Sequence, residues 1–152
     1  MPLHVVIAHL AVIVAPLTAL VALTYAVRPP ARRGMRWPLV LGAAVSITLT
    51  IWAADAGGTL WKSLKTAAEG RGTTLPPTVW AHAHGSDLFT VAVVALAITV
   101  LALVWWLLRP GRTQTVWAVV AAVLLGLAAI ATLVTAGIVL DQAMTAVWST
   151  QP

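Results

Sequence analysis

Long apolar segments separated by short polar ones are the dominant pattern along the chain. Four of these segments are long enough to cross the hydrocarbon core of a bilayer, which takes about 20 residues of helix. They cover residues 4–27, 38–56, 82–108 and 115–140. Runs such as VAVVALAITVLALVWWLL are apolar on every side and lack the alternation of a β-barrel strand. Because backbone groups in lipid need partners within the protein, the pattern predicts helices.

The predicted fold is an all-α integral membrane protein, an up-and-down bundle of four transmembrane helices forming one domain over residues 1–152. Hydrophobic residues make up 61% of the chain and charged ones 9%, which leaves no room for a soluble domain. The longest polar stretch is the predicted outer loop, residues 57–81, which is too short to build a core. Within it, TLWKSLKTAAEG has an amphipathic pattern, which predicts a short helix lying on the membrane surface.

The positive charge lies in two of the predicted loops. VRPPARRGMRW and LRPGRTQ contain six arginines and no acidic residue. All four acidic residues fall on the opposite side of the predicted membrane, together with the two lysines and the remaining arginine. By the positive-inside rule, both arginine loops face the cytoplasm and both termini lie outside. The net charge of +5 is therefore interpreted as a topology signal and not as a surface for nucleic acid.

The two halves of the chain resemble each other loosely. The first segment of each half opens with two histidines, in LHVVIAHL and WAHAHGSDLF. The second segment of each half ends with an aspartate followed by small residues and a tryptophan, in DAGGTLW and DQAMTAVW. This pattern suggests two two-helix repeats related by an axis along the membrane normal. Histidines and aspartates of both halves are then expected to converge at the outer end of the bundle.

The candidate site residues all lie at that outer end. The candidate cofactor ligands are His4, His9, His82 and His84, and the candidate metal ligands add Asp55, Asp87 and Asp141. His9 lies five residues beyond His4, about 7.5 Å deeper along a helix. At that depth an ionisable side chain is expected to face the bundle interior. The alternative is that these residues are ordinary interfacial anchors, with Asp87 and Ser86 capping the third helix.

Helical geometry limits how these histidines can combine. His4 and His9 are about 140° apart around a helix, and His82 and His84 about 160°, so neither pair shares a face. A site would therefore take one histidine from the first segment and one from the third, and His9 with His84 is the predicted pair. Two facing imidazoles suit haem b. The alternatives are a divalent metal such as zinc or copper, held with the aspartates, and a proton or quinone site built from His9 and an aspartate.

Several function classes are excluded or disfavoured. The chain has no cysteine, so thiolate chemistry and disulfides are excluded. It has no Ser/His/Asp nucleophile pattern, phosphate loop or HExxH motif, which argues against an enzyme without deciding the question. The leading hypothesis is a small redox or electron-transfer module that binds haem b or a metal. The alternative is a non-catalytic accessory subunit of a larger respiratory or redox complex. An ion carrier or sensor fits less well, because the arginine half of the bundle offers no polar path.

The chain resembles a known family. PLHVVIAHLAVIVAPLTAL, the aspartate–glycine end of the second segment, HAHGSDLF and DQAMTAVW are similar to the small four-span bacterial family catalogued as domain of unknown function 2231, actinobacterial type. Val5 follows His4 where relatives often carry proline, and the LDQAM run lacks their glycine and serine. The resemblance implies a multi-pass protein of the bacterial cytoplasmic membrane without an established activity. Relatives joined to Rieske-type iron–sulfur domains imply a redox setting.

Overall fold

The structure of the protein is a computed structural model that describes residues 3–111 and 113–148, without the side chains of residues 3, 4 and 146–148. Its elements are α1 (Leu3–Val27), a short 3-10 turn η1 (Pro29–Ala31), α2 (Arg32–Gly70), α3 (Pro77–Trp106) and α4 (Val116–Trp148). No strand occurs within these described ranges. All four α-helices are long and apolar enough to cross a membrane. The predicted all-α, four-helix membrane fold is confirmed.

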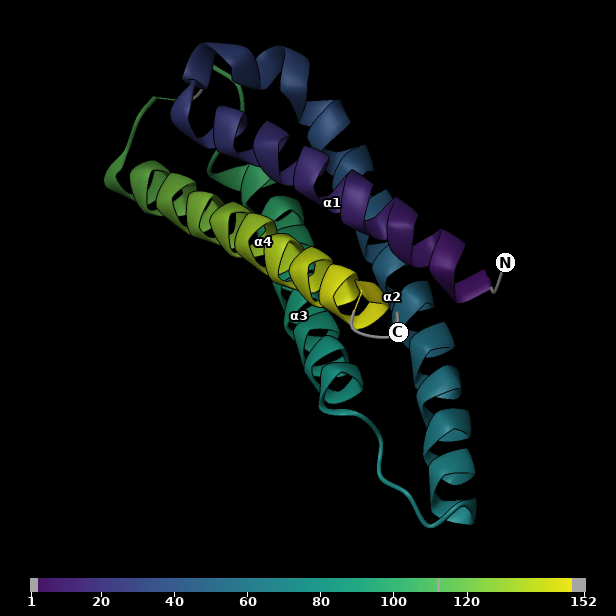
Figure 1. Ribbon diagram of the computed structural model, residues 1–152. Coiled ribbons are helices and arrows are strands. Elements are labelled where there is room, and N and C mark those ends of the chain that lie inside the picture. The colour runs from purple at the N-terminus through teal and green to yellow at the C-terminus, as the bar shows by residue number, and fades with distance from the viewer. Residues whose placement is uncertain (1–2, 112, 149–152) are drawn as a thin grey trace.

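The helices form an up-and-down bundle (Figure 1). Each helix packs against the next one in the chain, and α4 packs against α1 to close the ring, while α1 and α3 touch only slightly across it. The α1–α2 and α3–α4 connections lie at one end, called here the arginine end. The α2–α3 connection and the start of α1 lie at the other end, called here the histidine end. The short connections at the arginine end follow from the brief polar breaks seen in the sequence.

Small residues build much of the core, and large apolar ones face outward. The buried alanines are Ala11, Ala15, Ala19, Ala22, Ala26, Ala43, Ala92, Ala97, Ala118, Ala121, Ala129 and Ala136. By contrast, Ile13, Leu17 and Val91 are each more than half exposed. Lipid is as apolar as these side chains, so helix association in a membrane rests on close packing, which small residues permit. The arrangement is that of a bundle surrounded by lipid.

Gly42 of α2 is one place where this close packing can be tested. A β-carbon at Gly42 would lie 2.7 Å from Oγ1 of Thr18 on α1. Thr18 cannot easily move, because its hydroxyl donates to the Val14 carbonyl and lies 3.1 Å from Oγ of Ser46. We expect Gly42→Ala to lower the free energy of unfolding by about 1–3 kcal/mol through overpacking. Denaturation in detergent measures this, with Gly137→Ala as control, since nothing lies within 4 Å of a β-carbon there. Equal stability of the two variants would contradict this packing.

Tyr25 and Arg32 fix the arginine end. The Tyr25 hydroxyl donates to the Leu108 carbonyl at 2.8 Å and so joins the end of α1 to the residues just after α3. Arg32 donates from Nε to the Tyr25 carbonyl at 3.0 Å and from Nη2 to the Ala26 carbonyl at 3.2 Å. Carbonyls at a helix C-terminus have no partner within the helix, so these bonds cap α1. Both side chains are buried, at 0% and 4% exposure.

A second cluster at the same end consists of aromatic and guanidinium groups. The Arg36 guanidinium lies 3.9 Å from the centre of the Trp105 ring, within the range of a cation–π contact. Trp37 meets the same ring edge-on at 5.7 Å between centroids. These contacts join the start of α2 to the end of α3. Trp37 and Trp105 therefore take part in packing between helices.

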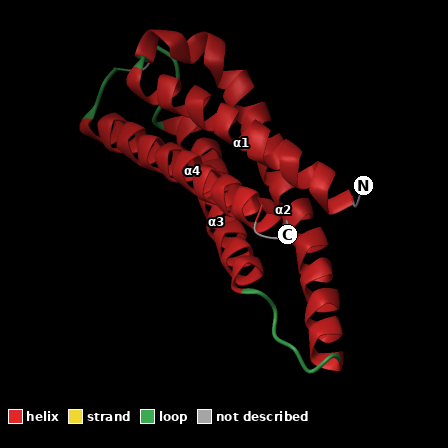
Figure 2. Ribbon diagram, in the orientation of Figure 1, coloured by secondary structure: helices red, strands yellow, loops and turns green. Residues whose placement is uncertain are grey.

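α2 corrects the predicted outer loop. It continues to Gly70 as one helix of 39 residues, about 58 Å long at 1.5 Å per residue. Residues 57–70 are thus part of α2, not a loop with a separate surface helix, and α3 already begins at Pro77. In Figure 2, α2 and the start of α3 extend beyond the visible ends of α1 and α4, joined by a short loop.

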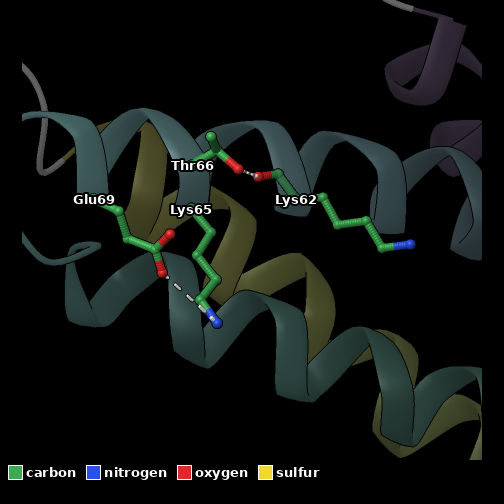
Figure 3. Close-up of polar contacts among 4 residues, drawn as sticks. All are labelled: Lys62, Lys65, Thr66 and Glu69. Atoms are coloured by element: carbon green, nitrogen blue, oxygen red, sulfur yellow. Dashed lines mark hydrogen bonds and ion pairs between the residues drawn. The ribbon is translucent and has the colours of Figure 1, made fainter.

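Local sequence explains this long helix. After Pro38, α2 contains no proline, and its glycine pair, Gly57 and Gly58, weakens the helix without ending it. On its exposed face, Lys65 forms an i,i+4 ion pair with Glu69 at 4.0 Å, and the Thr66 hydroxyl bonds the Lys62 carbonyl (Figure 3). An exposed pair of this kind contributes at most a few tenths of a kcal/mol, about 0.3–0.5.

Candidate functional site

A cavity of about 470 Å³ lies at the histidine end, mainly between α2 and α3. It is called here the histidine-end cavity. The α2 wall contains Ala53, Ala54, Gly57 and Gly58, whose small side chains leave the space open. Trp61 of α2 and Trp80 of α3 line the cavity on the side nearer the α2–α3 loop. Their rings meet edge-on at 4.5 Å between centroids. The cavity therefore lies at the base of the extended α2–α3 hairpin, and the tryptophan contact holds that hairpin together.

Polar side chains on one helix, α3, line the same cavity. His82, His84, Ser86 and Asp87 all border it. His84 and Asp87 are exposed, whereas His82 and Ser86 are half-buried. The exposed pair therefore marks the opening, and the wall changes from polar to apolar further in, where Phe89 of α3 is 4% exposed. The arrangement combines an imidazole- and carboxylate-bearing mouth with an aromatic and aliphatic interior.

Thr50 of α2 is the polar group in the buried part of the wall. It lines the cavity, is 2% exposed, and its hydroxyl has no hydrogen-bond partner. Other threonines within the helices bond the carbonyl four residues earlier, including Thr48 to Ala44 at 2.8 Å and Thr90 to Ser86 at 2.9 Å. A buried hydroxyl without a partner costs about 1–3 kcal/mol, which is unusual enough to need an explanation.

His9 is not part of this cavity, so the prediction that its depth directs it into the bundle is wrong. The residue is exposed, its Nδ1 lies 2.6 Å from the Val5 carbonyl, and it borders a shallow hollow with Val5, Val6 and Leu10. The face of α1 that reaches the cavity is the i, i+3, i+4 stripe of Ala8, Ala11 and Val12. Around the helix, His9 lies about 100° from Ala8 and about 60° from Val12, on the side of the stripe that turns away from the cavity. The predicted pair of His9 and His84 is therefore not brought together.

The other predicted residues are distributed as follows. Asp55 and Asp141 are exposed and do not line the cavity. The side chain of His4 lies outside the described part of the chain. The cavity histidines and aspartate all come from α3, so the expected convergence of both halves does not occur among the described side chains. Among those side chains, no three His, Asp or Glu residues come together as a group able to hold a metal ion.

Sequence reasoning missed three features of this site. Thr50 was not among the candidate site residues, and it lacks the backbone hydrogen bond that its neighbour Thr48 makes. Ala53 and Ala54, which also line the cavity, were not singled out. The contact of Gly85 with α4 was not predicted: Gly85 is buried, and a β-carbon there would overlap the side-chain amide of Gln142. That close approach joins α3 to α4 beside the cavity.

Comparison with known proteins gives no relative from which a function could be inferred. No model of a protein family matches the chain, and neither a curated protein nor a solved structure is significantly similar to it.

Proposed function

We propose that this multi-pass membrane protein is a small redox module that binds one lipid-soluble cofactor in the histidine-end cavity. The single observation that carries the proposal is a cavity of about 470 Å³ whose interior is apolar and aromatic and whose polar lining includes two imidazoles and a carboxylate of α3. Binding sites for small molecules have volumes of about 300–1,000 Å³ and combine apolar walls with a few convergent polar groups. The arginine distribution supports placing the histidine end outside the cytoplasm of a bacterial cell, with both termini on that side.

Haem b and a quinone are the two lipid-soluble cofactors to be considered for this cavity. Of the four predicted ligands, His82 and His84 line the cavity and are the residues that would hold a haem. His9, on a different face of α1, does not supply the second imidazole, so a haem here would have one histidine ligand from α3. The bound haem would supply one-electron chemistry. A divalent metal is less well supported, because His82, His84 and Asp87 of the cavity wall do not come together, among the described side chains, as a group able to hold a metal ion.

Cofactor binding should depend on the two cavity histidines and not on His9. The double variant His82→Ala/His84→Ala should lose most of the bound cofactor, while His9→Ala should retain it, since His9 lies outside the cavity. The amount of cofactor is measured on detergent-purified protein, as the Soret and reduced α and β bands of a haem or as the mass of a molecule in an organic extract. Equal yields of folded protein control for insertion. Loss of cofactor in His9→Ala alone would contradict the location of the site.

A second function, that of an accessory subunit, has one observation in its favour. The end of α2 extends past the bundle and exposes Leu60 and Leu64 by 43% and 40%. An extended hairpin with exposed apolar residues suits contact with a larger membrane complex. Purification from native membranes under mild conditions distinguishes this function, because it requires a stoichiometric protein partner.

A further inference from the structure

We infer that the ligand of the histidine-end cavity belongs to the quinone class, and that the Thr50 hydroxyl donates a hydrogen bond to its buried oxygen. The inference rests on the proposed function, since it specifies the chemistry of the molecule bound in that cavity. It also names Thr50, which was not among the residues predicted from the sequence, as the residue that determines which ligand is accepted.

The Thr50 hydroxyl lacks the hydrogen bond that a threonine inside a helix usually makes. In lipid, a threonine inside a helix normally satisfies its hydroxyl by donating to the carbonyl four residues earlier. Thr50 does not make that bond, although its hydroxyl is shielded from water. A rotation about χ1 exchanges the positions of the hydroxyl and the methyl group, so the hydroxyl can turn toward a molecule in the cavity that Thr50 lines. A hydrogen bond formed there, away from water, is stronger than one at the surface.

Thr50 and His84 lie at different levels along the two antiparallel helices that border the cavity. The contact of Trp61 with Trp80 sets the level of α2 against antiparallel α3, so that Gly57 lies about level with His84. Thr50 is seven residues from Gly57, which corresponds to about 10.5 Å along the axis. This separation of the two backbone levels places the Thr50 and His84 positions at different depths of the cavity, as a six-membered ring that carries an oxygen on opposite sides requires.

The side chains of the cavity wall are aromatic as well as polar. Phe89 borders the interior between the two polar levels, and Trp61 and Trp80 border the cavity above them, which suits a flat apolar ring. The His84 imidazole at the mouth can donate a hydrogen bond to the outer oxygen of such a ring. The vinyl edge of a haem or the acyl chain of a phospholipid would instead bring only hydrocarbon to Thr50 and leave its hydroxyl without an acceptor.

The experiment uses the full-length protein in detergent and a decyl-substituted 1,4-benzoquinone as the probe. Quinones quench tryptophan fluorescence, so binding is followed by the emission of the cavity tryptophans. Thr50→Val, which keeps the shape and removes the hydroxyl, should weaken binding about fivefold, the effect of losing one buried hydrogen bond. Thr50→Ser should restore it. Thr48→Val is the matched control, because that hydroxyl is on the same helix and bonds the Ala44 carbonyl.

Each outcome of this experiment either supports the inference or overturns it. Weaker binding in Thr50→Val, with wild-type binding in Thr50→Ser and Thr48→Val at equal melting temperatures, supports the inference. Equal affinity of wild type and Thr50→Val overturns it. Absence of probe binding to the wild type, with a Soret band that persists in Thr50→Val, also overturns it but leaves the proposed function standing. Absence of both a bound molecule and probe binding overturns the inference and the proposed function together.

Discussion

Replacement of Tyr25 by alanine should lower the free energy of unfolding of the bundle by about 3 kcal/mol, near the lower end of the range for deleting a buried aromatic ring. Tyr25 is fully buried within the core cluster at the arginine end. The loss comes mainly from packing contacts, because in lipid the transfer of the ring itself is nearly neutral. The variant also leaves the Leu108 carbonyl without its 2.8 Å hydrogen bond.

Two further variants separate these contributions. Tyr25→Phe keeps the ring and removes the hydroxyl, so it should cost about 1 kcal/mol. Trp117→Ala removes a larger ring that is 70% exposed on α4, and it should leave stability nearly unchanged. Reversible denaturation of the purified protein in mixed detergent measures all three. A cost for Trp117→Ala that equals the cost for Tyr25→Ala would contradict the described burial.

The second large effect is expected at the opposite end of the bundle. Gly58 lines the histidine-end cavity, and a β-carbon at this position meets nothing within 4 Å. A side chain can therefore begin at Gly58 without a clash, and we expect the ring of Gly58→Phe to occupy cavity space and to reduce ligand binding by about tenfold. Stability should stay equal or rise, since replacing a glycine inside a helix removes a cost of up to about 1 kcal/mol.

Gly137→Phe is the matched control for this variant. Gly137 also has nothing within 4 Å of a β-carbon, but it lies on α4 and does not line the cavity. Titration with the same benzoquinone probe, or the amount of cofactor retained after purification, measures the difference. Unchanged binding by a folded Gly58→Phe variant would show that the ligand lies elsewhere.

The fold was predictable because the requirements of lipid leave few choices. Segments as long and apolar as residues 4–27 have no stable state in a membrane other than a helix. The end of α2 was harder to predict, because Lys62, Lys65 and Glu69 are compatible both with a surface helix and with a continuous one. The contact between Trp61 and Trp80, 19 residues apart in the sequence, favours the continuous helix, and local periodicity does not report such a contact.

The site was predicted only in part. His82, His84 and Asp87 were identified from their position at the start of the third segment, and they do line the cavity. His9 was misplaced because depth was taken to decide orientation, although the rotation of α1 decides it and depends on which of its faces packs against its neighbours. Thr50 gave no signal, because the sequence cannot report whether a threonine hydroxyl bonds its own helix.

The two ends of the bundle differ in a way that suits the proposed function. At the arginine end, Tyr25 and Arg32 tie the ends of the helices together with buried hydrogen bonds. At the histidine end, α2 and α3 continue past the bundle as a hairpin, and the small residues of α2 leave space between them. A rigid end and an end with a cavity allow a ligand to be bound near one membrane surface while the bundle stays assembled.

Native mass spectrometry of the protein, extracted from its native membranes into mild detergent, shows whether the histidine-end cavity holds a lipid-soluble molecule. We expect the wild type to carry the added mass of one small molecule and Gly58→Phe to carry none. The mass of the chain alone in both proteins, without a visible absorption band in either, would show that the cavity holds no such molecule.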